Sequence, residues 1–319
     1  MESNHPILGD LTADQFLAEY WQKKPLLIRN AIPNFEPPID GNDLAGLSLE
    51  AEVESRLVIG DDWALEHGPF KESRFASLPE HNWSLLVQGV DLWVPEVAAL
   101  LSSFDFLPSW RVDDIMVSYA EDGGNVGPHF DYYDVFLIQG EGQRHWRIGQ
   151  QCSEADLHTD STALKILKNL EVTDEWTLNP GDMLYLPPKI AHHGVAIGQC
   201  TTFSVGFRAP AATEMLDDLA TELLSRDITP NHLQDPPLTA AMAKEPISGA
   251  YIQQVKELLQ QTLDDDQMLG EWFAQFMTEP KYPSLVGMTE ELRSASLENR
   301  PVAGSEISHN HYLNGQKQD

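Results

Sequence analysis

The period of the hydrophobic positions changes near residue 210. From about residue 111 to 208, short runs of β-branched and aromatic residues alternate with Gly and Pro turns, which is typical of a β-barrel or jelly roll. Beyond Pro210, apolar residues recur at helical spacing, beginning with Met215, Leu219 and Leu223. The pattern therefore predicts an α+β chain in which a β-rich domain precedes a helical one.

Shorter signals place the remaining elements. Thr12-Ala13-Asp14-Gln15 has the form of a capping box and predicts a helix start, and Leu26-Leu27-Ile28-Arg29 predicts a short strand. Two further apolar helical faces fall within residues 252–263 and 269–276. After residue 278 the chain becomes polar and Pro-spotted. We therefore expect three regions, with boundaries at residues 1–208, 209–278 and 279–319.

The charge balance limits the choice of partners. Among 319 residues there are 20 Lys plus Arg against 50 Asp plus Glu, a formal net charge of −30. Such a field repels nucleic acid and attracts cationic partners, so direct nucleic-acid binding is not expected. The plainer alternative is that the acidic surface only maintains solubility. Cys152 and Cys200 form no CxxC motif. No signal peptide is evident, and no apolar run is long enough to span a membrane. We therefore expect a cytoplasmic protein.

The clearest candidate chemistry lies in His129 and Asp131, with His192 about sixty positions later. Two histidines and one carboxylate are the ligands of the facial triad that holds non-haem Fe(II). The stretch from Pro128 to Gly140 is aromatic and β-branched and predicts a strand, on which residues i and i+2 share a face. His192 follows a Pro-Gly-Asp turn and a Pro-Pro corner. We therefore predict that the three side chains bind one metal ion.

Two other histidines, His158 and His193, are alternative candidates for a metal ligand. His158 and Asp160 repeat the His-x-Asp spacing, but their polar surroundings predict a surface loop. His192 and His193 are neighbours on a predicted strand, so they face opposite ways and only one can be the ligand. We assign the role of metal ligand to His192.

Four segments together resemble a known family. They are His129-x-Asp131, Arg144-His145-Trp146-Arg147, Pro180-Gly181-Asp182-x-Leu184-Tyr185-x-Pro187-Pro188 and Ser204-Val205-Gly206-Phe207-Arg208-Ala209-Pro210. The set is similar to the bacterial JmjC-domain ribosomal oxygenases, cupin-fold enzymes that hydroxylate an arginine of protein sixteen of the large ribosomal subunit. The likeness extends over roughly residues 10–290.

The resemblance implies a double-stranded β-helix that uses Fe(II), 2-oxoglutarate and dioxygen, with His129, Asp131 and His192 as the metal ligands. Arg144 is the expected partner of the co-substrate's far carboxylate, because it lies on a predicted barrel strand and guanidinium suits bidentate carboxylate pairing. Ser118 and Ser204 are weaker candidates for the same carboxylate. Asp113 or Asp114 is a candidate partner for a substrate guanidinium, with a solvated turn as the alternative.

The family likeness also carries expectations for the rest of the chain. It implies that residues 209–278 form a homodimer interface and that residues 279–319 are the opening part of a winged-helix-like domain. It implies a basic protein of the large ribosomal subunit as the substrate. The alternatives are a JmjC oxygenase acting on another protein, including N-methyl demethylation, a non-redox metal-binding cupin, and an acidic binding protein without catalysis. Arg144 argues against the non-redox cupin, which needs no buried cation for a dicarboxylate, and the intact set of His129, Asp131 and His192 argues against the binding protein.

Overall fold

A computed structural model describes residues 4–156, 164–226, 231–285, 303–304 and 311–318. The chain divides into two compact units, one of residues 1–209 and 282–301 and one of residues 210–281 and 302–319. The three-part division expected from the sequence stays a prediction. His158 and Asp160 lie outside the described residues.

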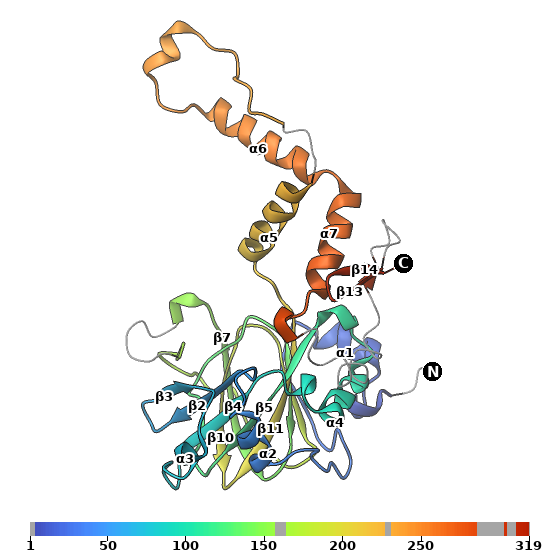
Figure 1. Ribbon diagram of the computed structural model, residues 1–319, viewed down its shortest axis with the longest axis vertical. Coiled ribbons are helices and arrows are strands. Elements are labelled where there is room, and N and C mark those ends of the chain that lie inside the picture. Colours follow the sequence, from blue (N-terminus) through green and yellow to red (C-terminus); the bar gives the residue numbers. More distant parts are fainter. Residues whose placement is uncertain (1–3, 157–163, 227–230, 286–302, 305–310, 319) are drawn as a thin grey trace. The chain divides into compact units, whose positions relative to one another are not determined.

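The first unit is built on two antiparallel sheets (Figure 1). The larger sheet has, in spatial order, β1 (Leu26–Ile28), β9 (Met183–Leu186), β6 (Val135–Gln139), β11 (Cys200–Phe207), β5 (Val112–Ala120), β4 (Trp83–Val87), β2 (Ser55–Ile59) and β3 (Ala64–His67). The smaller sheet has β10 (Ile190–Ile197), β7 (Gln143–Gln151) and β8 (Asp174–Leu178). Together with the helices that follow, these sheets confirm the predicted α+β jelly roll.

Short helices accompany the strands of this unit. The α-helices are α1 (Ala13–Glu19), α2 (Gly41–Leu47), α3 (Glu72–Phe75) and α4 (Pro95–Ala98). The 3-10 helices are η1 (Pro6–Leu8), η2 (Val90–Leu92), η3 (Ala99–Phe104), η4 (Ser109–Arg111), η5 (Glu154–Asp156) and η7 (Pro283–Leu285). The predicted capping box of α1 is present, with the Thr12 hydroxyl accepting from Gln15 N and the Gln15 side chain accepting from Thr12 N.

Alternation along β6 separates two apolar layers. Phe136 and Ile138 face a core that is shared with the N-terminal helices, where Phe16 packs edge-on against the Tyr185 ring at 5.0 Å between centroids. Val135 and Leu137 face the other way, into a smaller core between the two sheets. This is the period-2 pattern expected of a strand that is covered on both faces. Val135, Leu137 and Trp146 of this inner core also line the cavity that contains the candidate metal ligands.

Buried Asp134 fastens the N-terminal segment to the barrel. Its carboxylate accepts from the Tyr185 hydroxyl at 2.6 Å and from Gln22 Nε2 at 3.0 Å, while Gln22 N donates to the Tyr185 oxygen. Burial raises the pKa of Asp134, and these hydrogen bonds oppose that rise. The chain therefore enters β6 from a fixed point directly after the predicted metal ligands.

The second unit contains α5 (Ala212–Ser225), α6 (Gly249–Leu263) and α7 (Asp266–Thr278), with η6 (Ala240–Lys244) before α6. Leu219 of α5 packs with Met268 and Trp272 of α7, and Trp272 Nε1 donates to Asp218 at 2.6 Å. A small antiparallel sheet of β12 (Ala303–Gly304), β13 (His311–Leu313) and β14 (Gln316–Gln318) completes the unit. The winged-helix-like arrangement stays a prediction. No helix in the described ranges combines the length and apolarity needed to cross a membrane.

Candidate metal centre and its cavity

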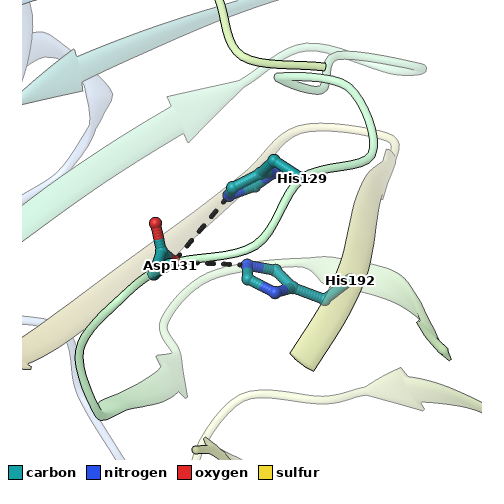
Figure 2. Close-up of side chains that lie close together, drawn as sticks. All are labelled: His129, Asp131 and His192. Carbon is teal, nitrogen blue, oxygen red and sulfur yellow. Dashed lines mark ion pairs between the residues drawn. The ribbon is translucent and has the colours of Figure 1, made fainter. Parts of the chain in front are cut away.

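The structure brings His129, Asp131 and His192 together (Figure 2). One ligand atom from each side chain lies within 4.8 Å of the others. Asp131 Oδ2 is 3.5 Å from His192 Nε2 and 4.0 Å from His129 Nε2. This is the only group of three or more His, Cys, Asp or Glu side chains with metal-binding geometry in the part of the chain that the structure describes.

The backbone around His129 differs from the predicted strand. Only Val135–Gln139 forms a strand, whereas His129 makes an isolated antiparallel bridge to His192 and Asp131 lies in the connecting loop. His129 N donates to His192 O at 3.0 Å, and His192 N donates to His129 O at 2.8 Å. The expectation of a continuous strand from residue 128 to 140 was therefore wrong, because the chain turns between Asp131 and Val135 before it joins the sheet.

Both imidazole rings are oriented by backbone carbonyls. His129 Nδ1 is 2.9 Å from Gly127 O, and His192 Nδ1 is 2.9 Å from Ile190 O. Because a carbonyl oxygen only accepts, each Nδ1 carries the proton and each Nε2 presents its lone pair toward Asp131. Such hydrogen bonds fix the tautomer and orientation of metal-ligating histidines.

The electrostatics of the three groups fit a divalent cation. Burial and the neighbouring His129 lower the pKa of His192 to about 4, so its ring is neutral near pH 7. Metal binding requires neutral imidazole and ionised carboxylate. Two imidazole nitrogens and one carboxylate oxygen, with a cavity on one side, suit non-haem Fe(II) better than a four-ligand structural zinc site.

The triad lines a cavity of about 320 Å³ that also contains Arg144. Arg144 is 4% exposed, and its Nε and Nη2 atoms have no hydrogen-bond partner among the described residues. Trp146 lies on the same face of β7 and also lines the cavity, as the strand alternation predicts. A buried guanidinium with unpaired donors is costly unless an acceptor completes it. Its surroundings therefore fit a bound carboxylate.

Hydroxyl groups on two paired strands share this cavity. Ser118 and Ser204, both singled out from the sequence, are 6% and 8% exposed and lie in the lining. Thr202 was missed, although it lies directly opposite Ser118 in the β5–β11 pair and its buried Oγ1 has no partner among the described residues. Thr is common in strands, so its residue type alone carried no signal; only the strand register places it beside Ser118.

The candidate substrate carboxylates have separate environments. Asp114 is 4% exposed, and both of its oxygens accept from Gln88 Nε2, at 2.8 and 3.0 Å. Arg208 Nε lies 3.8 Å from Asp113 Oδ1. The charge of Asp131 above all, together with burial and the charges of Asp114 and Asp113, raises the pKa of Tyr133 well above its usual value. Tyr133 thus keeps its proton beside a concentration of negative charge.

Adjacent His193 faces away from the triad, as the strand argument requires. Its Nδ1 lies 2.6 Å from Arg147 Nη2 and its Nε2 lies 3.1 Å from Asn125 Oδ1. Burial, followed by the positive charge of Arg147, lowers its pKa to about 4. His193 is therefore a neutral residue behind the site.

The Pro-Gly-Asp turn has a structural use. Asp182 accepts from Asn30 N at 2.9 Å and from Asn179 N at 2.9 Å, and its Oδ2 lies 2.6 Å from Arg29 Nη1. Gly181 has φ +84°, and an added Cβ would meet Ile32 O at 2.4 Å. The motif thus fastens the β8–β9 turn to the segment after β1.

Comparison with known proteins agrees with this geometry. The JmjC domain family matches residues 99–215, and the AraC-like ligand binding domain family matches residues 173–269. The chain is 38% identical over 269 residues to a ribosomal protein uL16 3-hydroxylase of Escherichia coli, covering 84% of this chain and 71% of the relative. It is 38% identical over 273 residues to a probable ribosomal oxygenase of Haemophilus influenzae, covering 83% and 67%.

Solved structures give the same result. The structure of E. coli YcfD matches with a TM-score of 0.81 and 35% identity over 96% of this chain and 85% of that one. The structure of YcfD with cobalt and 2-oxoglutarate matches with a TM-score of 0.79 and 34% identity over 97% and 86%. Fold, triad and sequence likeness agree, and the chain belongs to the family of JmjC-domain ribosomal oxygenases.

Proposed function

We propose that this protein is an Fe(II)- and 2-oxoglutarate-dependent oxygenase that hydroxylates an arginine side chain of a large-subunit ribosomal protein. His129, Asp131 and His192 would hold the metal. Metal, 2-oxoglutarate and dioxygen supply the oxidising chemistry, with succinate and carbon dioxide as the other products. The protein's own part is to hold these groups and to direct one C–H bond of the substrate toward them.

The observation that carries the proposal is the unpaired guanidinium of Arg144 in the same cavity as the triad. A bidentate pair with the far carboxylate of 2-oxoglutarate would satisfy its donors. Ser118, Ser204 and Thr202 would add hydroxyl groups on the facing sheet. YcfD with cobalt and 2-oxoglutarate is a relative that binds this kind of ligand. A non-redox cupin has no use for such a cation beside its metal.

A cationic substrate suits the charge around the cavity. Tyr133 lines the cavity, and the charge of Asp131 above all, with those of Asp114 and Asp113, raises its pKa, so a guanidinium beside Tyr133 would meet negative charge. The net charge of −30 would also attract a basic ribosomal protein over longer distances. The relatives named for ribosomal proteins support this substrate class. Direct binding of nucleic acid is not part of the proposal, and the cytoplasm is the compartment where such a substrate is made.

We also propose a homodimer formed by the helical unit. Ile252, Val255, Leu259 and Leu263 form one stripe along α6 and are 50%, 39%, 61% and 41% exposed. α6 has no buried residue, so its apolar stripe is uncovered within the described chain. A second copy offers an identical stripe, as a two-fold interface requires.

The test is intact-mass spectrometry of purified large-subunit ribosomal proteins after incubation with the enzyme, Fe(II), ascorbate and 2-oxoglutarate. One protein should gain a single oxygen atom, and fragmentation should place that atom on an arginine. The gain should need 2-oxoglutarate and vanish with the His129→Ala enzyme.

Other outcomes separate the alternatives. Loss of a methyl group from a methylated substrate would indicate demethylation instead. Binding of 2-oxoglutarate without any mass change in ribosomal proteins would keep the oxygenase and reject the substrate. Absence of both 2-oxoglutarate binding and mass change would reject the proposed function.

A further inference from the structure

The loop that precedes His129 contains one side chain on which three donors converge. Asn125 Oδ1 is 2.7 Å from Trp63 Nε1, 2.9 Å from Gly127 N and 3.1 Å from His193 Nε2. The three donors come from the segment before β3, from the loop itself and from β10. Asn125 therefore joins three segments that are distant in sequence directly behind the metal centre.

The direction of each hydrogen bond follows from chemistry. An indole N–H and a backbone N–H only donate, so the Asn125 atom that faces Trp63 and Gly127 must be the amide oxygen. His193 Nε2 must then donate to that oxygen as well. Arg147 also only donates, and it lies 2.6 Å from His193 Nδ1, which accepts. Arg147, His193 and Asn125 thus form one directed chain with a single consistent assignment.

This chain of hydrogen bonds reaches the metal ligand His129 through Gly127. The Gly127 carbonyl accepts from His129 Nδ1 at 2.9 Å, and the Gly127 amide donates to Asn125. Gly127 has φ +78°, and an added Cβ would lie 2.5 Å from Ile166 Cδ1 and 3.0 Å from Trp63 Cε2. Asn125 therefore holds the peptide unit that precedes Gly127, and packing against Ile166 and Trp63 confines Gly127 itself, whose carbonyl in the next peptide unit orients the His129 ring.

Other hydrogen bonds hold the start of this loop, Pro128 and His129, and Leu167 N donates to Pro128 O at 2.8 Å. Gly123 N donates to Ala196 O at 3.0 Å, and Ala196 N donates to Gly124 O at 3.0 Å. At the far end, His129 pairs with His192 through their backbones. Asn125 supplies the side-chain bonds in between, and its Nδ2 also donates to Gly123 O at 2.9 Å. Without the Asn125 side chain, Gly127 N would lose its acceptor, and the turn that leads to the Gly127 carbonyl would be held less firmly.

We propose that Asn125 is a positioning residue for the metal ligand His129, held in place by Trp63 and by the Arg147–His193 pair. The proposal rests on the proposed function, since it concerns the same metal centre. Partners of this kind behind metal ligands change metal affinity or activity by about 10- to 100-fold when they are removed. Asn125 acts one bond further out, through Gly127, so the lower end of that range is expected.

The experiment measures Co²⁺ binding to the metal-free protein by titration calorimetry and by the visible absorption of the bound ion. Asn125→Ala removes the shared acceptor and should weaken Co²⁺ binding about tenfold and alter the absorption bands. Asn125→Asp keeps an acceptor oxygen toward Trp63, Gly127 and His193 and should restore most of the affinity. Neither readout depends on turnover.

Gln139→Ala is the matched control. Gln139 is likewise a side-chain amide, more deeply buried than the half-buried Asn125, and its Nε2 donates to Glu141 O at 2.9 Å and Thr201 O at 3.1 Å, away from the triad. This variant should lower the melting temperature while keeping wild-type Co²⁺ affinity and spectrum. If Asn125→Ala does not fold, Trp63→Phe removes one donor to Asn125 and keeps an aromatic ring against Gly127. Trp63→Phe should then bind Co²⁺ more weakly than the wild-type protein.

The outcomes separate the two proposals. If wild type fails to bind Co²⁺, the proposed function is wrong. If wild type binds but folded Asn125→Ala has the same affinity and spectrum, only the positioning role is wrong. Equal losses of affinity in Asn125→Ala and Gln139→Ala would also overturn it, because general loosening of the barrel would then explain the effect.

Discussion

The barrel and the helical unit each leave a different kind of group without a partner. Inside the barrel, Arg144 and Thr202 are buried polar side chains with unpaired atoms. On α6, Leu259 and its neighbours in the stripe are apolar side chains open to solvent. Unpaired buried polar atoms in a cavity can be satisfied by a small polar ligand, whereas an exposed apolar stripe can be covered by another macromolecule.

This difference assigns separate tasks to the two units. The barrel buries its apolar side chains in four clusters of its own, so the groups that it leaves without a partner are polar. The helices α5 and α7 share one small cluster, and α6 contributes no buried residue. Mutations in the cavity should therefore change chemistry with little effect on assembly, and mutations on α6 should do the reverse.

The largest effect is expected at the metal centre. Asp131→Ala removes the carboxylate of the triad and should abolish measurable turnover and Co²⁺ binding, because two imidazoles without the carboxylate hold the ion poorly. The melting temperature of the metal-free protein should shift by less than about 4 °C, since the loss removes no buried apolar contact. Calorimetric titration and thermal unfolding measure these quantities, with exposed Glu52→Ala as the control. An active Asp131→Ala enzyme would contradict the assigned ligand set.

A smaller effect is expected when the guanidinium of Arg144 is removed from the cavity. Arg144→Ala should raise the KM for 2-oxoglutarate by about 30- to 1,000-fold, which corresponds to about 2–4 kcal/mol for a lost buried charge pair. Co²⁺ affinity and the dimer should be unchanged, because Arg144 is not among the three clustered ligands. Steady-state kinetics over a range of 2-oxoglutarate concentrations gives the answer. An unchanged KM would mean that another residue holds the co-substrate.

A substitution in the apolar stripe of α6 tests the proposed dimer. Leu259→Glu places a charge in the apolar stripe and should shift the dimer toward monomer in sedimentation experiments, with a loss of about 1.5–3 kcal/mol per buried leucine. Gln261→Glu is the matched control, because position 261 lies on the opposite side of the helix and is exposed. The barrel's Co²⁺ affinity should not change in either variant. A wild-type protein that is already monomeric would reject the dimer.

The smallest effect concerns barrel stability and its dependence on pH. Burial acts to raise the pKa of Asp182. Hydrogen bonds from Asn179 N, Asn30 N and the Arg29 side chain outweigh burial and lower this pKa below its usual value. A lowered folded-state pKa stabilises the fold above the unfolded pKa of about 3.9, and this stability is lost as pH falls through the folded value. Asp182→Asn should therefore cost about 1–3 kcal/mol at pH 7. Denaturant unfolding should show that the difference from wild type shrinks below pH 4; a constant difference would rule out the ionised carboxylate as its source.

Residue type and period were enough to predict several parts of this protein. The change from short strands to helical spacing gave the order of the β-rich and helical regions, and the capping box placed the start of α1. The spacing of His129, Asp131 and His192 matched a ligand set that few other residue combinations supply. Alternation along β7 placed Arg144 and Trp146 on one face. The inferences about helices, strands and the capping box use local rules that depend only on neighbours in the sequence, whereas the triad was inferred from residue type and from the motifs around each ligand.

The tertiary structure decided the rest, because those features depend on contacts between distant segments. Thr202 lies beside Ser118 only because β11 and β5 pair in one register, and period 2 fixes a face but not a register. His129 and Asp131 lie in a loop instead of a strand, and that loop is shaped by bonds to β10. Asn125 has no motif of its own and gains its place from Trp63 and His193. The sequence by itself determined which groups could bind a metal and a dicarboxylate, and only the folded chain determined what holds them in position.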